Sequence, residues 1–174
     1  MWPGLSWEWK SPVGRFGVTW RFARYILRRV AILDSLTPAE RSERMGRIRN
    51  KNTRPEMRVR RLLHRMGYRY RLHRRDLPGT PDLVFSARRK AIWVHGCFWH
   101  RHPDPSCKLA RLPKSRHDFW VPKLEGNRAR DLAKQEQLLA MGWTFLVVWE
   151  CDLRDEPALA DKLREFLGEP GVVR

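Results

Sequence analysis

Residues 90–107 read KAIWVHGCFWHRHPDPSC, an apolar run that leads directly into a segment rich in histidine and cysteine. The first six residues have the composition of a short strand, because β-branched and aromatic side chains favour extended backbone. The end of this run and the loop after it carry three of the six histidines and two of the three cysteines of the chain. The stretch therefore predicts a strand over 90–95 that opens into a metal-binding or catalytic site.

The segments on either side of this strand predict an α/β domain. Capping boxes that begin at Thr37 and Thr53 mark the starts of two helices. Apolar patterns and turn residues predict helices over 37–50, 53–67, 118–141 and 157–167, and strands over 68–73, 81–86, 90–95 and 143–149. The longest helix is expected to break near Pro122 and Gly126. The first three strands are joined by short turns and form a meander, and the last is apolar enough to be buried on both faces.

The chain has 174 residues, a length that predicts one ordinary domain, which we assign to 35–174. Residues 1–34 differ in composition and indicate a poorly ordered extension, to which we assign no function. The extension holds six basic and two acidic residues, so +13 of the formal charge of +17 stays on the domain. The basic character therefore belongs to the domain itself.

This positive charge favours a polyanionic partner, and nucleic acid is the expected one. An anionic membrane surface is the competing interpretation, but apolar stretches such as 145–149 are far shorter than the ~20 residues that span a bilayer. Three cysteines cannot pair off evenly, and no apolar leader with a cleavage site precedes the domain. We therefore expect a soluble protein of the cytoplasm, associated with the nucleoid.

The cysteines and one histidine have the spacing of a zinc site. Four residues separate Cys97 from His102, and four separate His102 from Cys107. Thiolate and imidazole groups at such loop spacings suit tetrahedral zinc. Cys151 becomes the fourth ligand if the strand over 143–149 pairs with the strand over 90–95. Each cysteine taken alone is better explained as a buried, reduced thiol, but the three cysteines together with His102 favour a structural zinc ion.

Catalysis by a hard cation needs oxygen ligands, and Asp82 in the segment LPGTPDLVF (77–85) offers one at the start of a strand. A turn-closing aspartate is the alternative interpretation. His95 and His100 follow the next strand and can act as general acid or base near neutral pH. Glu56 lies on the apolar face of its helix, which makes it a functional candidate, although a capping glutamate explains it as well.

Three segments, PGTPDLVF, IWVHGCFWHRH and FLVVWEC, resemble the very-short-patch repair (Vsr) endonuclease family over residues 36–155. The resemblance implies a restriction-endonuclease-like mixed β-sheet flanked by helices. It also implies an enzyme that nicks double-stranded DNA beside T:G mismatches left by deamination of 5-methylcytosine. A magnesium ion would assist water in attacking the phosphodiester, a structural zinc ion would be present, and other mismatch-repair proteins are candidate partners of what we expect to be a monomer.

Matched position by position, Asp82 resembles the magnesium-binding aspartate, the carbonyl of Val94 resembles its second protein ligand, and His100 resembles the general base. Supporting active-site residues of the family fall at His95, Glu56 and Asp131. The family's zinc ligands fall at Cys97, His102, Cys107 and Cys151. The loop PDPS (103–106) is longer than in the family, which leaves His100 open as an alternative to His102.

Family members insert apolar side chains into the duplex beside the mismatch, and these positions correspond to Met45, Phe98 and Trp99. Ordinary core packing is the alternative, and from the sequence alone it is favoured for Met45 but not for Trp99. Two other functions explain part of the pattern. A zinc-containing DNA-binding protein without catalysis would leave Asp82 and His100 unused, and a restriction-type nuclease would cleave without preference for a mismatch.

Overall fold

A computed structural model describes residues 51–171 together with Thr37, Glu40, Glu43 and Gly46. The strands are β1 (Arg71–Leu72), β2 (Leu83–Phe85), β3 (Lys90–His95) and β4 (Thr144–Trp149), and the helices are α3 (Arg54–Arg65), α4 (His117–Ala140) and α5 (Glu156–Leu167). Short 3-10 turns occupy Ser86–Arg88, Lys108–Ala110 and Glu150–Arg154. The strands form one sheet in the order β1-β2-β3-β4, which confirms the predicted α/β class with a mixed sheet.

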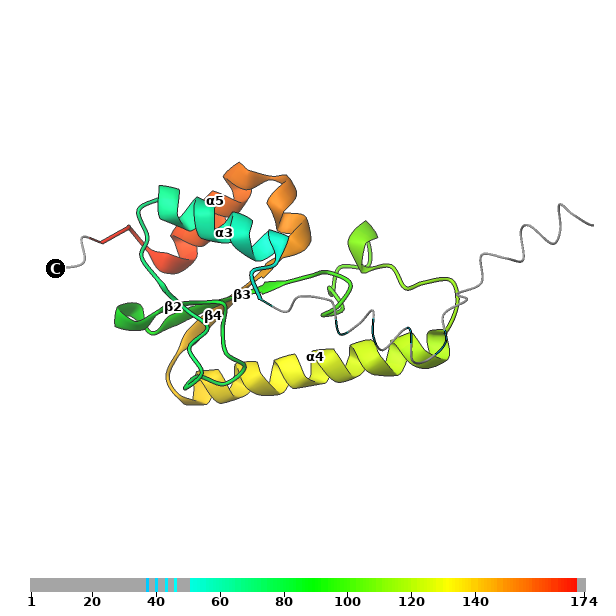
Figure 1. Ribbon diagram of the computed structural model, residues 1–174. Helices are drawn as coiled ribbons and strands as arrows, with labels where there is room; N and C mark the ends of the chain where they lie inside the picture. The colour runs from blue at the N-terminus through cyan, green and yellow to red at the C-terminus, as the bar shows by residue number, and fades with distance from the viewer. Residues whose placement is uncertain (1–36, 38–39, 41–42, 44–45, 47–50, 172–174) are drawn as a thin grey trace, which may run out of the picture. The chain divides into compact units, whose positions relative to one another are not determined.

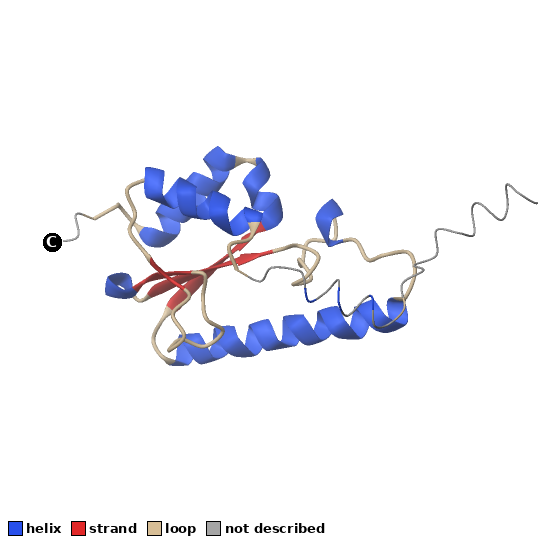
Figure 2. Ribbon diagram, viewed as in Figure 1, coloured by secondary structure: helices blue, strands red, loops and turns tan. Residues whose placement is uncertain are grey.

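The sheet lies between two helical layers (Figures 1 and 2). Helices α3 and α5 cover one face, and α4 runs across the other. The core under α3 and α5 contains Val59, Leu62, Leu63, Leu83, Phe85, Ile92, Val148, Leu159 and Leu163. The core under α4 contains Leu77, Val84, Ala91, Trp93, Leu138 and Trp143. Adjacent residues of β2 and β3 thus alternate between the two cores, as a sheet buried on both faces requires.

Helix α3 begins as its sequence predicts. The backbone N–H of Glu56 donates to Thr53 Oγ1 at 3.3 Å, and the N–H of Thr53 donates to Glu56 Oε2 at 3.3 Å. Gly67 follows the helix with a φ of 88°, a conformation that costs glycine little. The predicted capping box is confirmed, and it fixes Glu56 in the first turn of a helix that packs on the sheet.

The first predicted helix and the extension lie almost wholly outside the described residues. Met45 and residues 1–34 are among those not described. At the predicted start of the helix, the N–H of Glu40 donates to Thr37 Oγ1 at 3.2 Å, and the N–H of Thr37 donates to Glu40 Oε2 at 2.8 Å. The capping box at Thr37 is therefore present.

Several elements differ from the prediction, among them the strand expected over 81–86, which is shortened to Leu83–Phe85. Helix α4 is continuous from His117 to Ala140, so the expected break near Pro122 and Gly126 is wrong. Pro122 lies in the second turn, where it removes one backbone hydrogen bond, and the burial of leucines further along the helix outweighs that loss. The strand expected over 68–73 is reduced to the two residues of β1. Among the described helices, none has both the length and the apolar character needed to cross a membrane.

The sheet topology determines where its loops meet. β1, β2 and β3 are successive antiparallel neighbours, whereas β4 pairs parallel to β3 with His95 opposite Trp149. Because parallel strands end at the same edge, the loops after His95 and Trp149 leave the sheet side by side. The sequence predicts that Cys151 joins the other cysteines if these two strands pair, and the structure confirms that pairing.

Candidate active site

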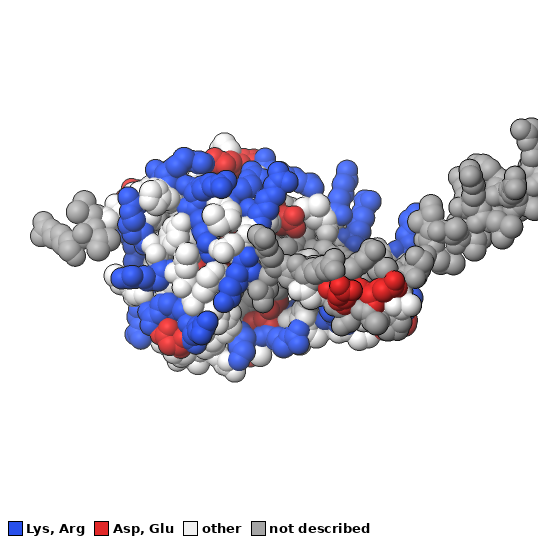
Figure 3. Space-filling model, viewed as in Figure 1, with Lys and Arg blue, Asp and Glu red and all other residues white. Residues whose placement is uncertain are grey.

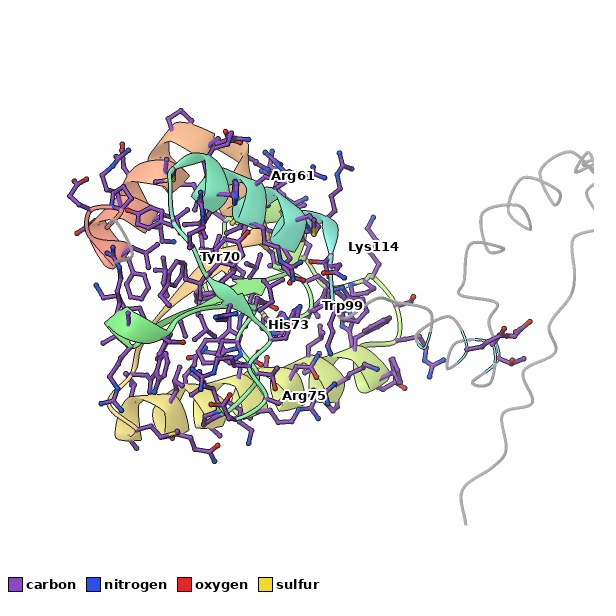
Figure 4. All side chains as sticks on the ribbon, turned by 60° about the vertical axis from the view of Figure 1, so that its left-hand side comes forward. Arg61, Tyr70, His73, Arg75, Trp99 and Lys114 are labelled. Atoms are coloured by element: carbon purple, nitrogen blue, oxygen red, sulfur yellow. The ribbon has the colours of Figure 1, made fainter. Side chains whose placement is uncertain are left out.

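A cavity of about 1260 Å³ opens where β3 ends, bounded by α3, the start of β2 and α4. Its lining includes the residues proposed for catalysis from the sequence, namely Glu56, Asp82, Val94, His95, His100 and Asp131. His73 and Trp99 line the same cavity, and Figure 4 shows His73 between α3 and α4. The fold therefore gathers into one cavity side chains that are spread over 76 positions of sequence, from Glu56 to Asp131.

Asp82 is held at the start of β2 by the neighbouring strand. The backbone N–H of Val94 donates to Asp82 Oδ2 at 2.8 Å. β2 and β3 pair only as far as Leu83 and Ile92, so Val94 lies beyond the ladder and its N–H can bind the carboxylate. Burial, with the charge of Glu56 in addition, raises the pKa of Asp82 to about 6 against the opposing hydrogen bond from Val94. A carboxylate in this environment is stabilised as an anion when it binds a cation.

His95 and His100 stack on each other beyond the end of β3, and Asp131 of α4 contacts His100. His100 Nδ1 lies 2.6 Å from Asp131 Oδ2, and the rings of His95 and His100 stack with centroids 3.9 Å apart. A hydrogen bond from Nδ1–H to the carboxylate leaves Nε2 of His100 as the proton acceptor. Burial, with the charge of His100 in addition, lowers the pKa of His95 to about 3. His95 is therefore neutral at neutral pH.

Helix α4 also fixes the loop that carries His100. Asn127 donates a hydrogen bond from Nδ2 to the carbonyl oxygen of Trp99 at 3.1 Å. Arg101 Nε donates to Glu125 Oε1 at 2.9 Å. Together with the contact between Asp131 and His100, these bonds attach the loop to about two turns of one helix.

Glu56 belongs both to the helix cap and to the cavity, so the two interpretations of this residue are compatible. Its side chain is 2% exposed and forms an ion pair with Arg60. Its Oε1 also lies 3.2 Å from Nε2 of His73, a residue that is not predicted from the sequence. The strand register accounts for its position, because pairing Leu72 with Leu83 places His73 opposite Asp82. Burial lowers the pKa of His73, and the charge of Glu56 partly offsets this effect.

The three cysteines converge beyond the sheet edge. Their sulfur atoms lie within 4.8 Å of one another. Nε2 of His102 lies 3.7 Å from Sγ of Cys151, whereas His100 is engaged with Asp131. Burial raises the pKa of Cys97 to about 12 and also raises the pKa of Cys151. Thiolate and imidazole are donors that suit zinc; the three sulfurs lie close together, and His102 lies near one of them.

Aromatic side chains form a cluster beside the cavity. The ring of Phe98 lies 5.0 Å from that of Trp99 and 5.3 Å from that of Trp120, in edge-to-face contacts. All three residues are only partly buried, and they are absent from both core clusters. The sequence points to Phe98 and Trp99 but not to Trp120, which lies on α4 some 20 positions later. Phe98 and Trp99 are thus placed as an aromatic surface and not as core residues.

Comparison with known proteins identifies the family. The family model described as DNA mismatch endonuclease Vsr matches residues 33–108. The chain is 56% identical over 134 residues to the type II nicking enzyme V.XorIIP of Xanthomonas oryzae pv. oryzae, which covers 77% of this chain and 96% of that protein. It is 40% identical over 139 residues to the DNA mismatch endonuclease Vsr of Escherichia coli K12, which covers 77% of this chain and 87% of that protein. It is 37% identical over 136 residues to the type II nicking enzyme V.NmeAIP of Neisseria meningitidis serogroup A, and the match covers 78% of this chain and 95% of that protein. The chain belongs to the Vsr family of DNA endonucleases.

Proposed function

We propose that this endonuclease nicks one strand of double-stranded DNA beside a T:G mismatch left by deamination of 5-methylcytosine, and so initiates very-short-patch repair. The reaction is hydrolysis of a phosphodiester by water, assisted by magnesium. The observation that carries the proposal is that Asp82 and the His100–Asp131 pair line one cavity. A hard-cation ligand and an oriented general base are the two groups that such a hydrolysis needs.

Asp82 and the carbonyl of Val94 would hold the magnesium ion. The Val94 N–H fixes the orientation of the Asp82 carboxylate through Oδ2, so that Oδ1 is the oxygen presented to a cation. Magnesium, when bound, supplies positive charge that offsets the charge developing on the scissile phosphate. Cation binding also removes the cost of keeping this buried carboxylate ionised, because its pKa is raised to about 6.

His100 accepts the proton of the attacking water at Nε2. Asp131 keeps the other ring nitrogen protonated and holds the ring plane, and it stabilises the imidazolium that forms. His95 stacks on His100 and stays neutral, so it can donate a ring N–H to an oxygen of the phosphate or of the leaving group. Glu56 orients the groups on the other side of the cavity, where it contacts Arg60 and His73.

Phe98 and Trp99, with Trp120 beside them, would wedge into the duplex next to the mismatch. Unstacking a base step costs a few kcal/mol, and less where the bases are already poorly paired. This difference is the physical source of the preference for T:G that we propose.

Cys97, His102, Cys107 and Cys151 would hold a structural zinc ion. The ligand set is complete without water, which is typical of structural and not of catalytic zinc. The ion would link the loop after β3 to the turn after β4, and thereby keep the aromatic residues and His100 in place.

The proposal is tested by single-turnover nicking of two duplexes that differ only in one base pair, T:G against T:A, with and without magnesium. We expect nicking of the T:G duplex at one phosphodiester, at least about 10-fold faster than nicking of the T:A duplex, and loss of both in a chelator. Equal rates on the two duplexes would instead indicate a nuclease without mismatch preference. No cleavage with any divalent cation would indicate a DNA-binding protein without catalysis.

A further inference from the structure

A second cavity, which we call the arginine pocket, lies between helix α4 and the loop that follows β3. Its volume is about 390 Å³, and its lining includes Arg101, Arg111 and Arg128. Arg101 belongs to the loop itself, Arg111 follows the 3-10 turn Lys108–Ala110, and Arg128 lies on α4. Figure 1 shows this loop beside the first half of α4. The mechanism proposed above uses none of these three guanidinium groups.

Glu125 holds two of the arginines close together. Arg101 Nε donates to Glu125 Oε1 at 2.9 Å, and Arg128 Nη1 lies 4.0 Å from Glu125 Oε2. Within residues 51–171, no further hydrogen bond or ion pair engages the two terminal nitrogens of Arg101, and none engages the side chain of Arg111. Their N–H groups therefore remain available to an anion in the pocket.

The lining of the arginine pocket has a surplus of positive charge. Among the described residues that line it, the only carboxylate is that of Asp104. Both of its oxygens are engaged within their own turn, because the Ser106 N–H donates to Oδ1 at 2.8 Å and Ser106 Oγ donates to Oδ2 at 2.9 Å. Like charges held together cost free energy, and an anion bound between them offsets that cost. Guanidinium groups also match the oxygens of a phosphate with paired N–H bonds, so the pocket has the chemistry of a phosphate site.

The arginine pocket lies next to the catalytic cavity along α4. Arg128 precedes Asp131 by three residues and Gln135 by seven, so the three side chains share one face of the helix, and the last two line the catalytic cavity. Three residues of a helix rise about 4.5 Å, whereas one strand of DNA rises ~3.4 Å for each phosphate. A strand with its scissile phosphate in the catalytic cavity therefore reaches the arginine pocket within about three nucleotides.

We propose that Arg101, Arg111 and Arg128 bind one backbone phosphate of the nicked strand, within about three nucleotides of the scissile phosphate. The inference rests on the proposed position of the scissile phosphate beside Asp82. A phosphate contact reads no base, but it fixes the register of the strand relative to the catalytic groups.

The test is duplex binding by the zinc-loaded full chain without magnesium. Each T:G duplex carries one neutral methylphosphonate, placed in turn at each phosphate of the nicked strand within about three nucleotides of the scissile one. Arg111→Gln and Arg128→Gln each remove one exposed guanidinium group. Arg101 is left unchanged because it lies between His100 and His102.

On the unmodified duplex we expect each variant to bind about 10-fold more weakly than the wild type. The slope of log K against log salt concentration should become less negative by about 0.9, the value for one phosphate contact. On one of the methylphosphonate duplexes, the wild type and both variants should bind equally, because the contact is already lost there. On the others, the variants should keep their deficit.

Arg164→Gln is the matched control for loss of charge alone. Arg164 lies on α5, which covers the other face of the sheet, and its side chain is 49% exposed against 52% for Arg128. We expect its affinity to change by less than about twofold, and by the same factor on every duplex.

An equal deficit of Arg111→Gln and Arg128→Gln on every duplex would mean that they act through general charge, and would overturn the inference. So would an unchanged affinity and salt slope of both variants on a fully paired duplex, a result that does not depend on the mismatch. Equal nicking of T:G and T:A duplexes by the wild type would instead reject the proposed function. In that case the salt slopes on the paired duplex still decide the inference, since a slope less negative by about 0.9 supports it.

Discussion

At the level of single residues, each reactive group of the cavity is oriented by a neighbour. His100 is oriented by Asp131 through a contact of 2.6 Å, and Asp82 is oriented by the Val94 N–H at 2.8 Å. In both pairs the neighbour binds one polar atom of the reactive group, and the second polar atom stays available for the reaction. Substituting His100, Asp131 or Asp82 should therefore alter the rate of nicking without disturbing the core.

The pair of His100 and Asp131 gives the first prediction. We expect His100→Gln to lower the single-turnover nicking rate by roughly 10²- to 10⁴-fold, since it removes the general base. Asp131→Asn should lower the rate as well, because the amide no longer fixes the proton on Nδ1. His117→Gln is the matched control, as His117 is exposed at the start of the same helix and should leave the rate unchanged. A His100→Gln enzyme with the wild-type rate would contradict the assignment.

At the scale of elements, the parallel pairing of β3 with β4 creates the cysteine cluster. With His95 opposite Trp149, Cys97 and Cys151 each follow two residues after paired positions. A zinc ion bound there would connect the ends of both strands, so its binding free energy would contribute to folding.

Cys151→Ser tests this role. We expect lower zinc content and a lower melting temperature, because the substitution removes one of four ligands of a site coupled to folding. Zinc is measured by atomic absorption after dialysis, and stability by thermal unfolding. Ser106→Ala, an exposed change in the loop between the other ligands, is the control and should retain zinc. Full zinc occupancy in Cys151→Ser would show that another group is the fourth ligand.

The packing of α3 on the sheet yields another prediction at this scale. Leu63 is fully buried in the core under α3 and α5. Leu63→Ala should lower the free energy of unfolding by about 2–5 kcal/mol, through lost burial and the cavity left behind. Leu132→Ala makes the same chemical change at a side chain that is 50% exposed on α4, and it should cost little. Denaturant unfolding measures both, and equal losses would contradict the assigned core.

The sequence predicted elements better than it predicted their contacts. β3 occupies Lys90–His95, the predicted residues, because its apolar composition and the flanking bend are local signals. The continuity of α4 through Pro122 was not predicted, since it depends on tertiary burial of Leu124 and Leu138. His73 was missed for a related reason: its place beside Asp82 follows from strand register, which no short segment encodes.

At the scale of the whole molecule, positive charge dominates the surface. Lys and Arg side chains cover much of the face in view in Figure 3, including the part over α3 and α5. The formal charge of the chain is +17. Such a surface attracts DNA of any sequence, so that selection of a mismatch must come from the cavity and the aromatic residues beside it.

This charge predicts a strong salt dependence of duplex binding. The slope of log K against log salt concentration is about −0.9 for each phosphate neutralised, so contact with six phosphates lowers affinity roughly 10³-fold between 50 and 200 mM salt. Fluorescence anisotropy with a fully paired duplex measures this slope. We expect this slope to be negative and several units in size for both the paired and the T:G duplex. A slope near zero would mean that the basic surface does not contact the DNA backbone.

The most direct measurement is the nicking rate of Asp82→Asn on a T:G duplex in magnesium, beside the thermal stability of the same variant. Asparagine keeps the shape of the side chain and removes the charge that would hold the cation, so we expect a loss of at least about 10³-fold in rate. The melting temperature should be unchanged or higher, because a buried carboxylate is replaced by a neutral group. Asp76→Asn, the same change at an exposed aspartate, should nick at the wild-type rate. Retained nicking by a folded Asp82→Asn enzyme would contradict the account.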